Sequence, residues 1–165
     1  MEISFSVVYG EGNEIFVSLS SFSDEALSDL TAITGSVDLV DISLARKSGN
    51  LYADWTTLTS ITARIAIILK ENPDIILYYY CDEISPIPYM RPTRNIKPAE
   101  YRNRLFSILT RKTIAGFPGL PVVDTPIMIE TENGCAYIHL IYLAHMKQKA
   151  DAIVSYLIDL AEGLK

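Results

Sequence analysis

The chain has 165 residues, of which 49% are hydrophobic and 21% are charged, and its formal net charge is −6. This length and apolar content are typical of one domain with a full core, and they argue against an intrinsically disordered protein. The negative net charge argues against general nucleic-acid binding, because a surface that holds a phosphate backbone without sequence preference is basic.

No apolar run approaches the roughly eighteen residues that a membrane-spanning helix needs, and the longest, around residues 65–69, is short. The first ten residues, MEISFSVVYG, alternate like a strand and contain no basic region of the kind that begins a signal peptide. The two cysteines, Cys81 and Cys135, are too few for a disulfide scaffold and lack the spacing of a zinc site. We therefore expect a soluble, cytoplasmic protein with no membrane segment and no metal.

The predicted elements begin with a hairpin. Residues 2–9 alternate apolar and polar side chains, which predicts a strand with one buried face. The turn sequence GEGN at 10–13 returns the chain as a second strand over 14–20. A short helix is expected at 24–33, and renewed alternation predicts a third strand at 40–45.

Two long helices and a buried strand follow. Asp54 is a good N-cap for a helix that ends before Pro73. The nearly continuous apolar run DIILYYYCD, residues 74–82, predicts a strand buried on both faces. The second helix begins near Pro98, a favoured first-turn proline, and ends at Gly116. Its expected apolar stripe consists of Tyr101, Leu105, Ile108 and Leu109.

The last third contains the strongest local signal. Residues 116–126 hold three prolines and two glycines, which predicts an extended connection. Asn133-Gly134 is then flanked by apolar runs, which predicts a hairpin with a type I′ turn. That turn sets His139 opposite Met128.

A final amphipathic helix is expected at 146–163. Strands separated by single helices, together with two hairpins, predict an α+β fold. We expect one domain over residues 1–165, built on a single mixed, largely antiparallel sheet of about six strands. Three to four helices are expected to lie mostly on one face of that sheet.

Half of all basic side chains lie between residues 91 and 112. Seven basic residues against one acidic residue give this segment a net charge of +6, so the rest of the chain carries −12. Arginine can hold a phosphate, a nucleic-acid backbone or an acidic protein surface, and tyrosine with arginine anchors many interfaces. Alternatively, the segment is a solvated helix face paired with carboxylates of its own chain. The candidate binding residues are Tyr89, Arg91, Arg94, Arg102, Arg104 and Arg111.

An alternative site lies where the strand 74–82 ends, because open sheets often present catalytic groups there. It would use Cys81 and Asp82. A nucleophilic thiolate needs a histidine or a nearby cation, and nothing in the sequence brings His139 to Cys81. The simpler interpretation is that Cys81 packs as a small apolar residue. No cofactor, metal or catalytic motif is present, so an enzyme is the less favoured interpretation.

Three short motifs occur in a characteristic order in the central third. Asn72-Pro73 ends a helix, Cys81-Asp82 ends an apolar strand, and an RxxxF motif runs from Arg102 to Phe106. In this order they resemble a family of small, uncharacterised bacterial α+β proteins to which no activity is assigned. The resemblance implies the architecture and no mechanism.

We expect a non-enzymatic cytoplasmic binding module that uses residues 89–112 against an anionic partner or a protein, without a cofactor. A toxin-neutralising immunity protein is one such module, and in that role the acidic remainder would face a basic toxin. Two alternatives stay open. One is a small enzyme in which Cys81 and Asp82 meet arginines of the basic segment. The other is a structural homo-oligomer, which the apolar excess and the sheet edges favour.

Overall fold

The structure is a computed structural model that describes residues 1–23, 27–35, 37–49, 53–81, 96–131 and 134–163. Its elements in chain order are β1 (Glu2–Tyr9), β2 (Asn13–Ser21), α1 (Ser28–Thr34), β3 (Asp38–Ser48), α2 (Trp55–Glu71), β4 (Ile75–Cys81), α3 (Pro98–Gly116), β5 (Val122–Thr131), β6 (Gly134–Leu143), the 3-10 turn η1 (Ala144–Met146) and α4 (Lys147–Gly163). No helix in these residues is long and apolar enough to cross a membrane.

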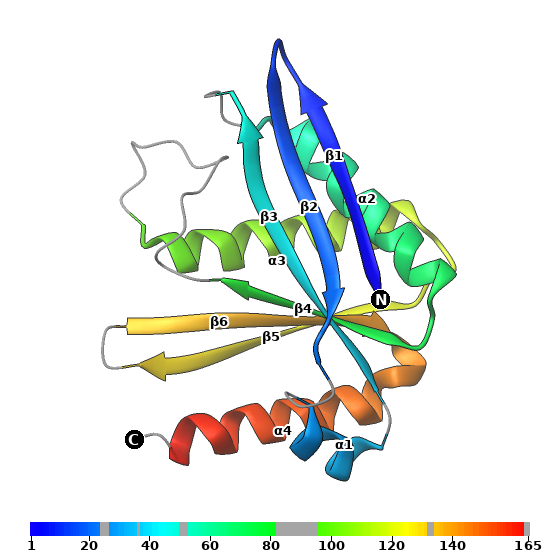
Figure 1. Cartoon of the computed structure of the whole chain (residues 1–165), viewed down its shortest axis with the longest axis vertical. Helices are drawn as coiled ribbons and strands as arrows, with labels where there is room; N and C mark the ends of the chain where they lie inside the picture. The colour runs from blue at the N-terminus through cyan, green and yellow to red at the C-terminus, as the bar shows by residue number, and fades with distance from the viewer. Residues whose placement is uncertain (24–26, 36, 50–52, 82–95, 132–133, 164–165) are drawn as a thin grey trace.

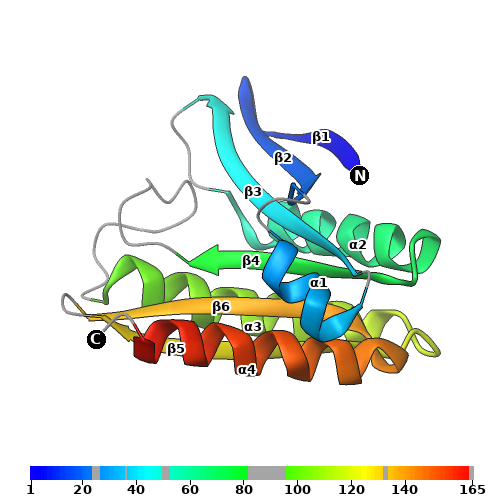
Figure 2. The ribbon, with the colours of Figure 1, turned by 60° about the horizontal axis from the view of Figure 1, so that its bottom comes forward.

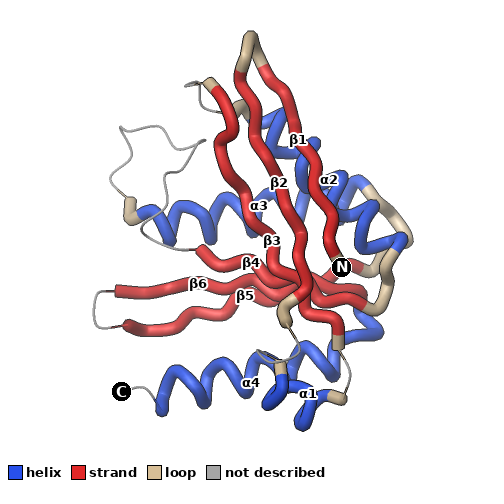
Figure 3. Tube along the Cα trace, in the orientation of Figure 1, coloured by secondary structure: helices blue, strands red, loops and turns tan. Residues whose placement is uncertain are grey.

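The six described strands form one sheet in the order β1-β2-β3-β4-β6-β5 (Figure 1). β3 and β4 are parallel and α2 joins them, whereas every other neighbouring pair is antiparallel. Figure 3 shows the twist of the sheet, which carries β1, β2 and the end of β3 away from the β5–β6 hairpin. The predicted fold class is confirmed: the described residues form an α+β fold with one mixed, largely antiparallel sheet of six strands and with four helices.

The helices cover both faces of the sheet. α2 and α3 lie on one face, and α1 and α4 lie on the other (Figure 2). This division differs from the expected placement of the helices mostly on one face. The reason lies in β4, where Ile75 and Leu77 belong to one core and Ile76 belongs to the other. A strand that is apolar on both sides is fully buried only when helices cover both sides of the sheet. Each Å² of apolar surface removed from water stabilises the fold by roughly 25 cal/mol.

Local signals place the helix starts as predicted. The Asp54 carboxylate accepts hydrogen bonds of 2.7 Å from both the backbone N–H and the hydroxyl of Thr57, which caps α2. The bond from the Thr57 hydroxyl is the main reason that the pKa of Asp54 is lowered. Pro98 occupies the first turn of α3.

The β5–β6 hairpin forms, but its register differs from the predicted one. His139 pairs with Pro126 instead of Met128, a shift of two residues. Because side chains alternate with a period of two, this shift leaves each side chain on its expected face. β5 also begins at Val122, inside the 116–126 segment that the sequence predicts as a connection. Pro126 is tolerated there because β5 is an edge strand.

Tyr78 lies in the interior of the sheet, between Asp41 of β3 and Leu140 of β6. Its ring meets Phe22 edge-on, with ring centroids 5.4 Å apart. Burial, followed by the negative charge of Asp41, raises the pKa of Tyr78 to about 12. Burial also raises the pKa of Asp41. Both pKa values are therefore shifted toward the protonated form.

We predict that Tyr78 lowers stability at alkaline pH. The unfolded chain releases the phenol proton near the ordinary pKa of 10.0, whereas the folded chain retains it to about 12. The contribution of the protonated Tyr78 phenol to the free energy of unfolding is therefore complete below about pH 10. This contribution is lost as the pH rises through about 12. Urea denaturation at increasing pH should show a smaller loss of stability for Tyr78→Phe than for wild type. Tyr80→Phe, which changes an exposed tyrosine of the same strand, is the control. Equal losses in wild type and Tyr78→Phe would contradict this assignment.

Candidate functional site

α3 carries most of the described part of the basic segment, and an aromatic contact packs it onto the sheet. The Phe106 ring stacks on Tyr79 of β4, with centroids 4.4 Å apart. The same ring lies 5.2 Å from the imidazole of His139 on β6. Aromatic pairs of this kind contribute about 0.5–1.5 kcal/mol beyond the area that they bury.

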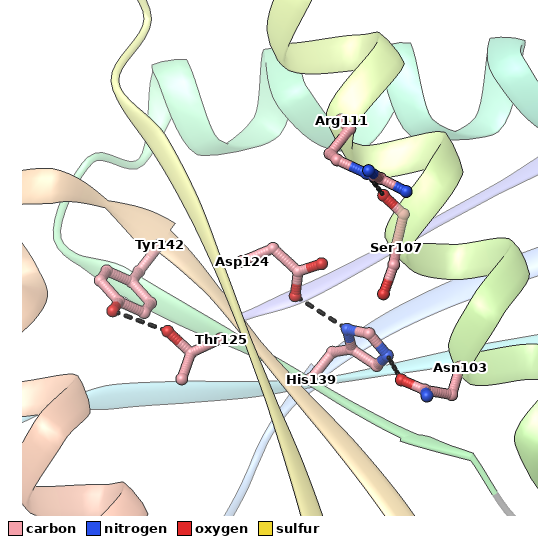
Figure 4. Close-up of polar contacts among 7 residues, drawn as sticks. All are labelled: Asn103, Ser107, Arg111, Asp124, Thr125, His139 and Tyr142. Carbon is pink, nitrogen blue, oxygen red and sulfur yellow. Dashed lines mark hydrogen bonds and ion pairs between the residues drawn. The ribbon is translucent and has the colours of Figure 1, made fainter.

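His139 is completely buried, and both of its ring nitrogens are hydrogen-bonded (Figure 4). Nδ1 lies 2.8 Å from Oδ1 of Asp124 on β5. Nε2 lies 3.0 Å from Oδ1 of Asn103 on α3. The observed register explains the contact between Asp124 and His139. Because Pro126 pairs with His139, Asp124 lies on the same face of the hairpin as His139, diagonally across the two strands. The three side chains therefore connect α3 to both strands of the hairpin.

These partners determine where the imidazole holds its protons. The Asp124 carboxylate only accepts, so Nδ1 carries a proton. Nε2 then either donates to the Asn103 amide oxygen, as part of an imidazolium, or accepts from the amide nitrogen after a half-turn of that amide. In both states each ring nitrogen is engaged within the protein. This arrangement suits a structural histidine better than a general base.

Cys81 is completely buried on the neighbouring strand. Tyr79 pairs with His139 and Cys81 pairs with Tyr137, so Cys81 lies one diagonal step from the histidine on the same face. The sequence could not show this proximity. Because Asp124 and Asn103 engage the ring nitrogens of His139, the contacts agree with Cys81 as a core residue rather than an activated nucleophile. Asp82, its proposed companion, lies outside the described residues.

The candidate arginines differ in their surroundings. Arg102 is only 5% exposed and lies in the core, so it does not belong to a binding surface. Arg104 is exposed and pairs with Glu100 one turn earlier on α3. The side chain of Arg111 is exposed as well, and its Nε–H donates to the backbone oxygen of Ser107 at 3.3 Å. The other candidates, Tyr89, Arg91 and Arg94, lie outside the described residues.

Lys112 and the chain's only tryptophan bring α3 and α2 together at the surface. The Lys112 ammonium lies 4.6 Å from the centroid of the Trp55 ring, and Trp55 is 40% exposed. Ile108 is also 40% exposed, although its spacing predicts a place in the apolar stripe. Within the described residues, neither Arg111 nor Lys112 contacts a carboxylate. We call the exposed side chains of Trp55, Arg104, Ile108, Arg111 and Lys112 the basic–aromatic surface.

The cavities lined by described residues beneath α3 are too small for an organic substrate. Two cavities, each of about 20 Å³, lie against Phe106 and share Thr62 of α2. A cavity of this volume has room for about one water molecule. Among the described residues, no three His, Cys, Asp or Glu side chains are placed to hold a metal ion.

Comparison of the chain with models of protein families, with curated proteins and with solved structures gives no match. The resemblance to small bacterial α+β proteins stays a prediction.

We predict that His139→Ala lowers the free energy of unfolding by roughly 3–5 kcal/mol, because Asp124 and Asn103 each lose a buried partner. The control is His145→Ala. His145 also contacts an aspartate, Asp74, at 3.0 Å, but both side chains are at least half exposed. Such a surface pair contributes less than about 1 kcal/mol. Urea denaturation of both variants measures the difference, and similar small losses would show that the buried network does not stabilise the fold.

Proposed function

We propose that this protein is a binding module whose basic–aromatic surface docks an acidic segment of a protein partner. The observation that carries the proposal is the pair of exposed cations, Arg111 and Lys112, that contact no carboxylate among the described residues. The chain has 20 acidic residues against 14 basic ones, so acidic partners are plentiful within it. Cations that no described carboxylate contacts, despite this surplus, are available to a partner.

The aromatic and aliphatic members of the surface favour a protein over a nucleic acid. Tryptophan and arginine are the side chains that most often dominate binding energy at protein interfaces. Trp55 and Ile108 add apolar contact area that a phosphate backbone does not use. Lys112 over the Trp55 ring restrains both side chains before binding, which reduces the entropy that a complex loses. The net charge of −6 opposes a long polyanion.

The proposal includes a cytoplasmic location and a non-enzymatic role. Cys81 and Cys135 do not form a disulfide with each other, which supports a reducing compartment. A bacterial source, as the resemblance implies, belongs to the same proposal.

The fluorescence of Trp55, the only tryptophan, reports directly on this surface. We expect a synthetic peptide of glutamate and leucine to change the emission in a saturable way, and added salt to weaken the binding. Arg111→Glu/Lys112→Glu should weaken binding at least about tenfold, since each reversed charge now repels the peptide. Lys70→Glu/Lys147→Glu is the control, because it alters two exposed lysines of α2 and α4 with the same change in net charge.

Two further probes make the test specific. A peptide of lysine and leucine should leave the Trp55 emission unchanged, and a single-stranded oligonucleotide should bind more weakly than the acidic peptide. Circular dichroism confirms that each variant is folded. Equal binding by the two double variants would assign the peptide to another surface, and tighter binding of the oligonucleotide would replace the protein partner with a nucleic acid.

A further inference from the structure

β1 is an edge strand, because among the described residues no strand pairs with its outer side. The N–H of Ser21 donates to the carbonyl of Met1 at 2.9 Å, which fixes the phase of the β1–β2 ladder. In an antiparallel pair, residues that bond to the neighbouring strand alternate with residues that turn away from it. The residues of β1 whose N–H and C=O groups face outward are therefore Glu2, Ser4, Ser6 and Val8.

A proline protects the opposite edge of the sheet, and the residues of β1 include no such device. The N–H of Ala144 donates to the carbonyl of Pro121 at 2.8 Å, and the same alternation puts Pro126 among the outward positions of β5. A proline there offers no donor to another strand. β1 contains no proline, no residue with positive φ and a single charged residue, Glu2. Its Val8 is 70% exposed. An edge of this kind is a template for a further strand.

The adjacent helix presents a self-complementary pattern on the same side of the molecule. Arg64 of α2 lies over the Phe5 ring of β1, 4.5 Å from its centroid, so this face of α2 borders the β1 edge. Arg64, Ile67 and Glu71 share that face, because they are three and four residues apart. Ile67 is 43% exposed. Among the described residues, neither Arg64 nor Glu71 forms an ion pair, so opposite charges flank an exposed apolar side chain.

We infer that this side of the protein binds a second copy of the chain, with β1 antiparallel to its counterpart. A two-fold axis that passes between the two copies of Phe5 would pair Glu2 with Val8 of the partner subunit, and Ser4 with Ser6 of the partner subunit. All the outward backbone groups of β1 are then bonded, and no like charges face each other. The two sheets become one continuous sheet.

The same axis brings the two copies of α2 together in antiparallel orientation. Ile67 lies between Arg64 and Glu71, three residues after one and four before the other. Each Arg64 then faces Glu71 of the partner subunit on either side of the two Ile67 side chains. A two-fold interface requires this self-complementarity of charge. The inference does not rest on the proposed function, because Arg111 and Lys112 take no part in the interface.

Sedimentation equilibrium tests the inference with paired variants. Wild type should be a reversible dimer, and Ser4→Ala should match it because the backbone donor is retained. Ser4→Pro removes that donor without touching the β1–β2 ladder, so we expect its dimer dissociation constant to rise at least about tenfold. Arg64→Glu should weaken the dimer, and the charge swap Arg64→Glu/Glu71→Arg should restore it.

Circular dichroism and thermal melting establish that each variant is folded, and the charge swap decides the matter if Ser4→Pro is not. A monomeric wild type at about 1 mM overturns the inference, as does a dimer that neither Ser4→Pro nor Arg64→Glu weakens, or a swap that fails to restore association. Arg111→Glu/Lys112→Glu should remain dimeric. A failure of the acidic-peptide test therefore leaves the dimer test unaffected.

Discussion

The placement of α3 depends on the buried imidazole of His139. This ring has two nitrogens and no access to water, so each needs a partner inside the protein. Asp124 on β5 and Asn103 on α3 supply the partners, while Phe106 covers the ring. A helix that moved along the hairpin would leave buried polar atoms unpaired, at a cost of about 1–3 kcal/mol for each group. The histidine therefore fixes the hairpin register and the position of α3 together.

The contacts of α3 with His139 also determine which side chains of this helix are exposed. With Asn103 and Phe106 turned inward, the phase of the helix exposes Arg104 and Arg111 along one flank, because they are seven residues, or nearly two full turns, apart. The same phase buries Arg102, only two residues from Arg104. Thr113 reinforces this phase, since its hydroxyl bonds to that of Thr62 on α2 at 2.7 Å. The basic–aromatic surface thus follows from how the opposite side of α3 is packed.

The sequence predicts those features that depend on neighbours along the chain. Asp54 and Pro98 begin their helices as expected, because capping and first-turn preferences act within a few residues. The predicted hairpin register is wrong because it rests only on the preference of Asn133-Gly134 for a two-residue turn. In the structure the buried imidazole of His139 needs Asp124 as a partner, and the observed register supplies it. Asn103, Asp124 and His139 are at least fifteen residues apart, so no local pattern reveals their contact. The meeting of Trp55 with Lys112 is hidden for the same reason.

The uneven charge of the chain sets the range over which the proposed surface acts. The residues outside 91–112 carry −12, so an acidic partner is repelled by most of the chain and attracted only near α3. At physiological salt, interactions between exposed charges fade beyond about 8 Å, which limits both effects to the immediate neighbourhood of the contact. The Lys112 ammonium, which lies 4.6 Å from the centroid of the Trp55 ring, therefore attracts a partner's carboxylate only at close range. Association would then depend on close contact with the ring and its cation rather than on electrostatic steering from a distance.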